Sequence, residues 1–311
     1  MPFDPAVQSV VDGLSQQGLK PFDALSLDET REAVGLFATL QNPPRYVATV
    51  AEMAYPGPGG PQDLRIYVPD AAEPLPVVVY FHGGGFIAGD LSVADEPSRA
   101  LANDLQAIVV AASYRLAPEH KFPAASDDTF AALGWVVDNI SQHGGDPSRI
   151  AVLGDSAGGN LAAVAALRAR DEGGPVLRAQ VLVYPTIDPL ANTQSRKECS
   201  DGPVISAAAL DHFWRQYLSA PEDAENPWAA PSKAASLRDL PPALVLTTEY
   251  EVVRDEAEAY GEQLSAAGVL TDVIRFDGLI HGVWWMSGAV PRSAEMHEAI
   301  VSFLRDKLRS D

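Results

Sequence analysis

The sequence predicts an α/β fold, in which helices cover both faces of a mostly parallel sheet. Short apolar runs alternate with longer stretches of helical periodicity through most of the 311 residues. A Gly-x-Ser-x-Gly sequence, running from Gly154 to Gly158, stands between one of these runs and a stretch rich in alanine and leucine. This motif carries a reactive serine when a buried strand precedes it and a helix follows it. The motif and the predicted fold therefore support each other.

Composition excludes several classes of partner. The chain has 42 acidic and 22 basic residues and a net charge of −20, which disfavours nucleic acid and anionic membrane surfaces. Cys199 is the single cysteine, so the chain has no intrachain disulfide and is compatible with a reducing compartment. We find neither a signal-peptide pattern nor a run of about 18 apolar residues, and we expect a cytoplasmic location with no membrane contact.

The first 46 residues predict two amphipathic helices. Apolar side chains recur at helical spacing in residues 7–14 and again in residues 34–40, and Asn42-Pro43-Pro44 ends this part of the chain. Two small surface helices are the simplest interpretation of this segment, and a cap is the alternative that we favour. Residues 47–68 alternate between apolar and polar side chains around a turn rich in proline and glycine, which is typical of an antiparallel hairpin.

The remaining elements alternate between strands and helices. Continuous apolar runs predict strands at 77–81, 107–113, 150–153, 179–184, 243–248 and 271–276. Helical patterns occupy 93–105, about 124–143, 161–167, 254–267 and about 292–308. Residues 186–241 interrupt this order, because they hold a helical stretch at 206–218 and no strand pattern. We therefore expect a catalytic domain of residues 47–185 and 242–311 with a cap insertion at 186–241.

Ser156 is the predicted nucleophile. It follows an apolar strand and precedes a helix, so its hydroxyl lies on a tight turn at the edge of the sheet. The N–H groups at the start of that helix can stabilise an oxyanion. An ordinary glycine-rich turn without chemistry is the alternative, and the strand and helix around the motif argue against it.

His281 is the predicted base. A nucleophilic serine needs a base, and in this fold class the chain order is serine, then acid, then histidine. Of the six histidines, His281 follows both Ser156 and the last predicted strand, in a loop that begins at Gly278. Such a loop lies at the carboxyl edge of the sheet.

The acid has two candidates after the strand at 243–248. Glu251 stands at the strand-to-helix turn, where it can reach the base. Asp255 and Glu256 would open the following helix, where acidic side chains favour the helix dipole, and Glu249 can still belong to the strand end. We favour Glu251 over Asp255, and the residues alone leave both open.

His82-Gly83-Gly84-Gly85 follows the predicted strand at 77–81. Successive glycines let backbone N–H groups approach a substrate without obstruction by side chains. A glycine-rich loop after this strand matches the position of an oxyanion loop.

These motifs together resemble those of the hormone-sensitive-lipase-like carboxylesterases, the bacterial family IV esterases. The pair His82-Gly-Gly-Gly-Phe86 and Gly154-Asp-Ser-Ala-Gly-Gly159 carries the resemblance, and the segments 114–120, 184–185 and 280–282 agree with it. The resemblance implies an α/β-hydrolase fold of about eight strands with a helical cap. It also implies hydrolysis of short-to-medium-chain acyl esters through an acyl-enzyme on Ser156, without a cofactor or a metal.

The resemblance assigns further roles, residue by residue. It implies that the backbone N–H groups of Gly84, Gly85 and Ala157 form the oxyanion hole, with Gly83 as a further candidate. One departure concerns the acid. The family usually has Asp-Pro-Leu-Arg-Asp-Glu where this chain has Glu251-Val-Val-Arg-Asp-Glu256. The acid therefore falls on Glu251, with glutamate in place of aspartate and without the proline that would stiffen the turn.

Residues near these motifs are the candidates for a substrate pocket. They are Phe86, Asp155, Ile205, Phe213, Trp214, Val283 and Trp284. Ordinary core packing is the alternative for each of them. The expected partner is a small-molecule ester, and a homodimer remains open.

Two other functions remain as alternatives. The same scaffold supports an amidase or formamidase, and by the same resemblance it also supports a non-catalytic small-molecule receptor. Such receptors tend to lose the catalytic histidine, so the presence of His281 argues against that function.

Overall fold

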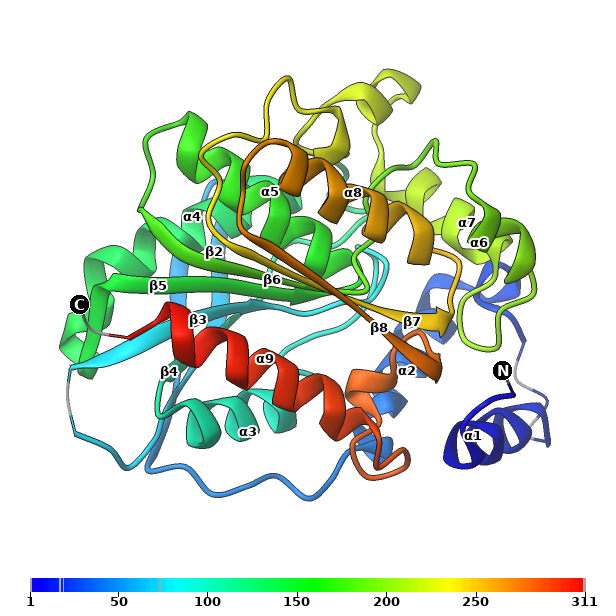
Figure 1. The fold of residues 1–311 in the computed structure, drawn as a ribbon, viewed down its shortest axis with the longest axis horizontal. Coiled ribbons are helices and arrows are strands. Elements are labelled where there is room, and N and C mark those ends of the chain that lie inside the picture. The colour runs from blue at the N-terminus through cyan, green and yellow to red at the C-terminus, as the bar shows by residue number, and fades with distance from the viewer. Residues whose placement is uncertain (1, 17, 19, 73, 310–311) are drawn as a thin grey trace.

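One eight-stranded sheet organises residues 2–16, 18, 20–72 and 74–309, which a computed structural model describes (Figure 1). The strand order is β1-β2-β4-β3-β5-β6-β7-β8. β1 and β2 form the predicted hairpin, β2 pairs antiparallel with β4, and the other neighbouring pairs are parallel. The strands are β1 (Thr49–Gly57), β2 (Gly60–Val68), β3 (Leu75–Phe81), β4 (Ile108–Ala112), β5 (Gly145–Asp155), β6 (Leu177–Val183), β7 (Ala243–Tyr250) and β8 (Thr271–Ile280). The predicted mostly parallel sheet of about eight strands is confirmed.

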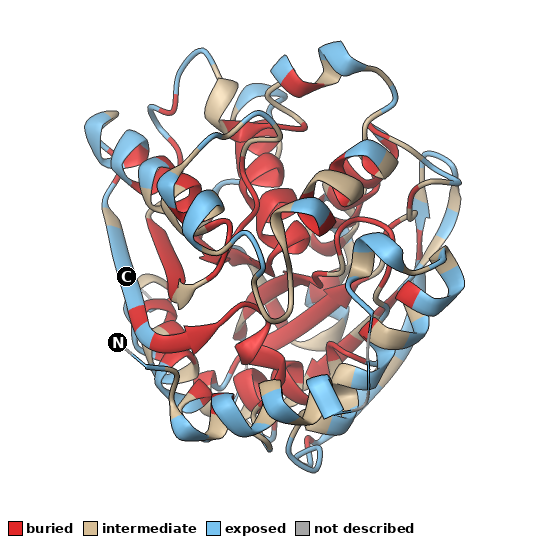
Figure 2. Ribbon diagram, turned by 90° about the vertical axis from the view of Figure 1, so that its right-hand side faces the viewer, coloured by how far each residue is buried: buried red, intermediate tan, exposed pale blue. Residues whose placement is uncertain are grey.

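Helices cover both faces of the sheet, as the alternating pattern predicts. α3 (Asp95–Leu105) and α9 (Ser293–Lys307) lie on one face. α4 (Ala124–Asn139), α5 (Ala157–Asp171) and α8 (Arg254–Ala266) lie on the other. The central strands are therefore buried on both sides, which explains their continuous apolar sequences. Figure 2 shows that buried residues concentrate in the sheet and on the inner sides of the helices.

Two segments outside the sheet have helices near the carboxyl ends of the strands. The N-terminal segment holds α1 (Pro5–Gln16), η1 (Phe22–Ala24), α2 (Leu27–Gly35) and η2 (Leu36–Leu40). The segment between β6 and β7 holds α6 (Gln194–Glu198), α7 (Ala207–Tyr217), η4 (Pro221–Glu225) and η5 (Pro231–Lys233). The rings of Phe22 and Phe213 join the two segments, with 5.7 Å between their centroids.

Two differences from the sequence prediction concern the end of β8 and a short helix. β8 continues to Ile280, four residues beyond its predicted end at Phe276, because pairing with β7 resumes at Tyr250 and Ile280 after an irregularity. Gly278 has φ +79° at this irregularity, a conformation that favours glycine. The strand therefore ends directly before His281. The second difference is the short helix α6, which the sequence prediction missed.

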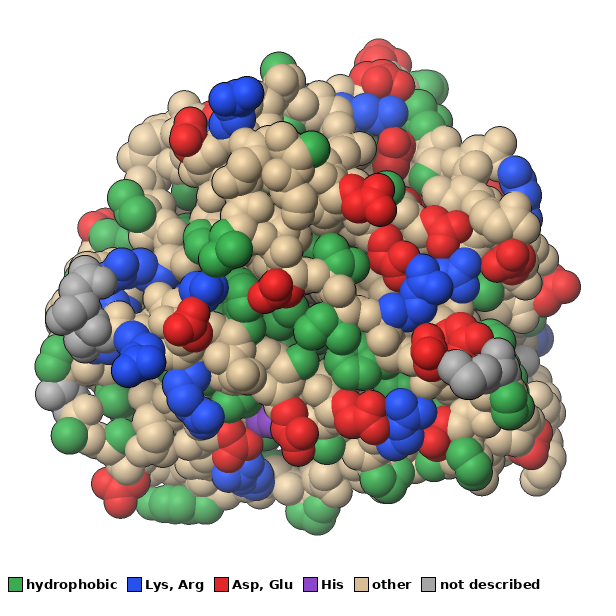
Figure 3. Space-filling view, viewed as in Figure 1, with side chains coloured by type: hydrophobic (Ala, Val, Ile, Leu, Met, Phe, Trp, Pro, Cys, Tyr) green, Lys and Arg blue, Asp and Glu red, His purple; other side chains and the backbone are tan. Residues whose placement is uncertain are grey.

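The surface carries charges of both signs. Figure 3 shows acidic and basic side chains interspersed over one face. Within the described ranges, every helix is too short or too polar to cross a bilayer.

Candidate active site

Ser156 occupies a sharp turn between β5 and α5. Its backbone has φ +55° and ψ −119°, which is a strained conformation for a residue with a side chain. The chain passes very close to itself here. A Cβ atom on Gly154 would lie 2.0 Å from the carbonyl oxygen of Gly158, and one on Gly158 would lie 2.0 Å from that of Phe81. Both motif glycines are therefore required by the close approach of strand, turn and helix.

Backbone hydrogen bonds hold this turn in place. The N–H of Ser156 donates to Val183 O at 2.9 Å, at the end of the neighbouring strand β6. Its carbonyl accepts from the N–H of Asn160 at 3.1 Å and from that of Thr186 at 3.3 Å. The loop after β6 thus supports the strained residue from behind, which fixes the direction of its side chain.

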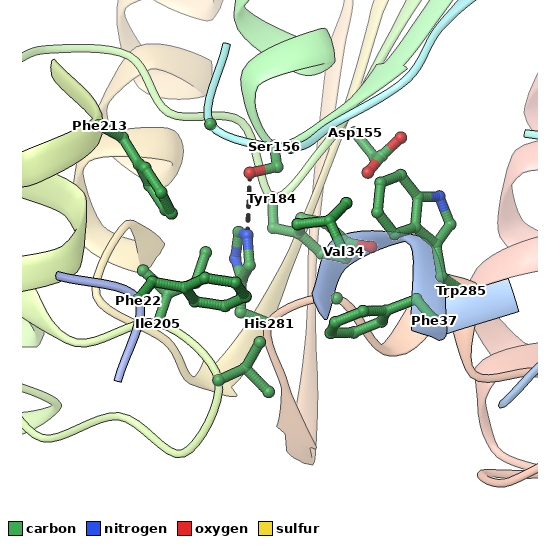
Figure 4. A pocket seen from close by; sticks show the side chains of 14 residues that line it. Phe22, Val34, Phe37, Asp155, Ser156, Tyr184, Ile205, Phe213, His281 and Trp285 are labelled. Atoms are coloured by element: carbon green, nitrogen blue, oxygen red, sulfur yellow. Dashed lines mark hydrogen bonds between the residues drawn. The ribbon is translucent and has the colours of Figure 1, made fainter. Parts of the chain in front are cut away.

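Ser156, His281 and Glu251 form one continuous hydrogen-bonded chain. Nε2 of His281 lies 2.9 Å from Oγ of Ser156, as the dashed line in Figure 4 marks. Nδ1 of His281 lies 2.9 Å from Oε2 of Glu251. The other oxygen of Glu251 accepts a 2.6 Å hydrogen bond from the N–H of Thr248. All three side chains are buried, and the order of contacts is the one a serine nucleophile needs.

The other acidic side chains of residues 249–256 are directed toward different partners. Asp255 accepts hydrogen bonds from the N–H of Ser195 at 2.7 Å and from Arg254 Nε at 2.9 Å. Glu256 accepts from the N–H of Ile187 at 2.7 Å, and Glu249 accepts from that of Gly278 at 2.7 Å. Asp255 therefore joins α6 to the start of α8, while Glu251 is the carboxylate placed against His281.

The glycine loop after β3 lies beside Ser156. Gly84 and Gly85 line the same pocket and have φ +119° and +62°. A Cβ atom on Gly84 would lie 2.1 Å from Ala88 O, and one on Gly85 would lie 2.6 Å from Cγ of Phe213. Ala157 begins α5, so its N–H belongs to the first turn, whose donors have no partner within the helix.

Gly83 requires a correction. Its N–H donates to Oδ1 of Asp155 at 3.1 Å and is therefore engaged by a carboxyl group instead of facing a substrate. The hydroxyl of Tyr80 donates to the same oxygen at 2.7 Å. Burial raises the pKa of Asp155 to about 7, although both hydrogen bonds favour the carboxylate. Asp155 thus ties the first glycine of the loop to the turn that holds Ser156.

A pocket with about 410 Å³ of empty space, part of it open to solvent, leads to Ser156 and His281 (Figure 4). Phe213, Phe22 and Ile205 lie on one side of the Ser156–His281 pair. The other side holds Tyr184, Val34, Phe37, Trp285 and Asp155. The pocket therefore has two arms, one on each side of Ser156, and both are lined mainly by apolar and aromatic side chains.

The predicted pocket residues divide into two groups. The structure places Asp155, Ile205 and Phe213 on the pocket. Phe86 and Trp214 instead pack with Tyr217; the Phe86 and Tyr217 rings stack at 3.9 Å.

Val283 and Trp284 belong to η6 (Val283–Trp285) and also lie outside the lining. The ring centroids of Trp284 and Tyr80 are 5.3 Å apart. All four of these residues are buried and lie outside the lining of this pocket, which favours the core-packing alternative.

Sequence reasoning missed several lining residues. Val34, Phe37 and Phe22 come from the N-terminal segment, and Tyr184, Val204, Gly282 and Trp285 come from the loops and the η6 turn around the site. Val34 and Phe37 belonged to a recognised helical pattern, and a cap was expected from it. That signal predicted contact with the site but not which side chains reach it.

The geometry suits acyl transfer. An activated hydroxyl, a base oriented by a carboxylate and nearby backbone donors are the groups that this chemistry needs. Among the residues that the structure describes, no three His, Cys, Asp or Glu side chains gather in a way that could hold a metal ion.

Comparison with known proteins identifies the family. The family model for the α/β-hydrolase fold matches residues 78–285, which is more than half of the chain. The chain belongs to the α/β-hydrolase fold family. It is 43% identical over 303 residues to the esterase LipI of Mycobacterium tuberculosis, covering 94% of this chain and 91% of that protein. It is 39% identical over 300 residues to the carboxylesterase NlhH of the same species, covering 94% and 92%.

A solved structure agrees with these relatives. The hyperthermophilic esterase of the archaeon Pyrobaculum calidifontis superposes with a TM-score of 0.90 and 40% sequence identity. The match covers 98% of this chain and 99% of that one. The resemblance to hormone-sensitive-lipase-like esterases, first seen in the glycine loop and the serine motif, is confirmed.

Proposed function

We propose that the protein hydrolyses short-to-medium-chain acyl esters through an acyl-enzyme on Ser156. The observation that carries this proposal is the hydrogen-bonded chain from Glu251 through His281 to Ser156 at the floor of an apolar pocket. The named relatives, an esterase and a carboxylesterase, support the same reaction class. The protein is accordingly a carboxylic ester hydrolase.

In the first half-reaction, Oγ of Ser156 attacks the ester carbonyl as Nε2 of His281 takes the hydroxyl proton. The new carbon–oxygen bond moves the carbonyl electron pair onto oxygen, where the N–H groups of Gly84, Gly85 and Ala157 stabilise the charge. Glu251 accepts the hydrogen bond from Nδ1 of His281, which orients the ring and stabilises it once it is protonated.

The intermediate then collapses. His281 gives its proton to the leaving alcohol oxygen, the original ester bond breaks, and the acyl group remains on Ser156. A water molecule repeats the sequence, with His281 as the base for its attack and then as the acid that returns the proton to Ser156. The products are a carboxylic acid and an alcohol.

The pocket supports the proposed range of substrates. Its walls are mainly apolar, and they include large side chains such as Phe213 and Trp285 on its two sides. We propose that residues 1–46 and 186–241 act as the cap, since each contributes side chains to these walls. A pocket of this kind favours apolar acyl and alcohol groups of limited length.

A substrate panel tests the reaction class. Acetate, butyrate, octanoate and palmitate esters of p-nitrophenol should show efficient turnover up to the octanoate and a decline at palmitate. The matched acetanilide should react far more slowly, and Ser156→Ala should lose ester turnover. Faster turnover of the anilide than of the ester would favour the amidase alternative.

The homodimer and the cellular location remain proposals. β8 is an edge strand, and Val273 and Ile274 on it are exposed together with Leu270. An exposed apolar edge suits pairing with a second copy of the chain. Light scattering on the wild type and on Val273→Lys tests this, and a monomeric wild type would contradict it. Cell fractionation tests the cytoplasmic location.

A further inference from the structure

Arg31, on the cap helix α2, reaches across to the catalytic domain. Its Nε donates to the carbonyl of Ile87 at 2.9 Å, and its Nη2 donates to that of Ala117 at 3.4 Å. The outer side of the guanidinium makes two hydrogen bonds to the carboxylate of Glu119, at 2.9 and 2.7 Å. Such a fork fixes the guanidinium plane, which then holds the two carbonyls.

Ile87 belongs to the turn that presents the proposed oxyanion donors. The N–H groups of Ile87 and Ala88 both donate to Gly84 O, at 3.2 and 3.0 Å. Three successive residues of this turn, Gly84, Gly85 and Phe86, have φ of +119°, +62° and +65°. The value at Phe86 is strained, so the surrounding structure must hold this turn.

The turn has two outside supports at adjacent carbonyls. The N–H of Ala117 donates to Phe86 O at 3.0 Å, and Arg31 donates to Ile87 O. The first support comes from the catalytic domain, and the second comes from the cap. Loss of the second would release the Ile87–Ala88 peptide, whose N–H donates to Gly84 O, and would loosen the turn that sets the directions of the Gly84 and Gly85 N–H groups.

We propose that Arg31 is a positioning residue of the oxyanion loop, so that the N-terminal cap completes the active site as well as covering it. This inference rests on the proposed function, in which Gly84 and Gly85 stabilise the oxyanion. Stabilisation of a developing charge depends on donors that are already aligned, so a misaligned loop slows the chemical step more than it weakens substrate binding. Val34, one turn further along the same helix, lines the pocket, so the helix that holds the loop also contributes to the pocket wall.

Four variants separate this role from simple attachment of the cap. Arg31→Met keeps the length of the side chain and removes all of its donors. Arg31→Lys keeps a cation toward Glu119 without the Nε donor toward Ile87. Glu119→Gln removes the charge of the pair but keeps one acceptor for the guanidinium, so the bond from Arg31 to Ile87 should stay in place. Arg45→Met is the matched control, because Arg45 lies on the same N-terminal segment and pairs with Asp104 at 2.7 Å instead.

The readouts are kcat, KM and the affinity of a boronic acid that forms a tetrahedral adduct on serine. We expect kcat to fall about tenfold or more in Arg31→Met and several-fold in Arg31→Lys, with boronate affinity falling in parallel and KM nearly unchanged. Glu119→Gln and Arg45→Met should keep most of their kcat. Melting curves identify a variant that has failed to fold, and Arg31→Lys then supplies the test.

Full kcat in Arg31→Lys, a rise in KM alone, or an equal loss in Arg45→Met would each overturn the inference. Ser156→Ala serves as the reference. Continued ester turnover in Ser156→Ala would overturn the proposed function itself, whereas full kcat in Arg31→Lys beside an inactive Ser156→Ala would overturn only the role of Arg31.

Discussion

Oε2 of Glu251 lies 2.9 Å from Nδ1 of His281, whereas the carboxylate of Asp255, one helical turn further on, accepts the N–H of Ser195. The backbone explains the difference. Glu251 stands before α8, at the carboxyl end of β7, while Asp255 is already in the first turn of α8. The side chain of Glu251, longer than that of the aspartate usual at this position, reaches the imidazole.

Glu251→Gln should reduce kcat by at least about 10²-fold, because the imidazole loses the charge that stabilises its protonated form. Glutamine can still accept a hydrogen bond through its carbonyl oxygen, so kcat should fall less than it would on removal of the whole triad. Steady-state kinetics with melting curves measure the effect.

Asp255→Asn is the paired variant. It should change kcat little, and it should cost on the order of 1 kcal/mol of stability by weakening the contact between α6 and α8. An inactive Asp255→Asn beside a normal Glu251→Gln would reverse the assignment of the acid.

Gly158→Ala should inactivate or unfold the protein. The added methyl group would lie 2.0 Å from Phe81 O and 2.5 Å from His82 O, and both are backbone atoms at the carboxyl end of β3. Overpacking of this kind costs about 1–3 kcal/mol or more.

Gly134→Ala is the matched control for this variant. Gly134 lies within α4 and has nothing within 4 Å of the added atom, so it should stabilise the protein by up to about 1 kcal/mol. Calorimetry of both variants checks the pair, and equal melting temperatures would contradict the tight approach at the serine turn.

Glu256 predicts a pH dependence of stability. Burial raises its pKa from the ordinary value of 4.5 to about 8, although the N–H of Ile187 stabilises the carboxylate. Between these two pH values the folded protein holds a proton that the unfolded chain has lost. The contribution of Glu256 to the free energy of unfolding is therefore fully present below about pH 4.5 and is lost as the pH rises toward 8.

Glu256→Gln removes this titration. The free energy of unfolding of this variant, relative to that of the wild type, should rise by at least about 1 kcal/mol as the pH increases from about 5 to about 9. Denaturant unfolding at a series of pH values measures the difference. A difference that is constant with pH would show that Glu256 is ionised in the folded protein.

Phe22→Ala should shift acyl preference toward longer chains. The ring of Phe22 lies on the pocket wall beside Phe213, and its removal lengthens that arm. The ratio of kcat/KM for octanoate to that for acetate should rise several-fold, since each buried methylene contributes about 0.8 kcal/mol.

Phe130→Ala is the control for the pocket variant. Phe130 lies on α4, and its ring centroid is 4.7 Å from Cζ of the Arg168 guanidinium. It should leave that ratio unchanged, and an equal shift in both variants would remove Phe22 from the pocket.

The sequence was sufficient for the parts of the site that local geometry demands. Gly154 and Gly158 permit the close approach of strand, turn and helix, so the place of Ser156 followed from the motif together with the strand before it and the helix after it. His281 followed from the order of strands, because the carboxyl ends of parallel strands meet at one edge. The sheet itself followed from the alternation of apolar runs with helical patterns.

Side-chain directions in the cap could not be predicted in this way. Phe213 and Trp214 are neighbours on α7, yet one lines the pocket and the other packs against Phe86 and Tyr217. Which of them faces the substrate depends on how α7 rests against the N-terminal segment, and no local motif encodes that contact. The engagement of the Gly83 N–H by Asp155 was hidden for a similar reason, since it joins two loops far apart in the sequence.

Covalent trapping tests the central claim most directly. A p-nitrophenyl alkylphosphonate should react with the wild-type protein, release one equivalent of p-nitrophenol and leave an adduct that peptide mass spectrometry places on Ser156. Glu251→Gln should react much more slowly, and Ser156→Ala should not be labelled. A stoichiometric adduct on another residue, or equal labelling of Ser156→Ala, would contradict the account.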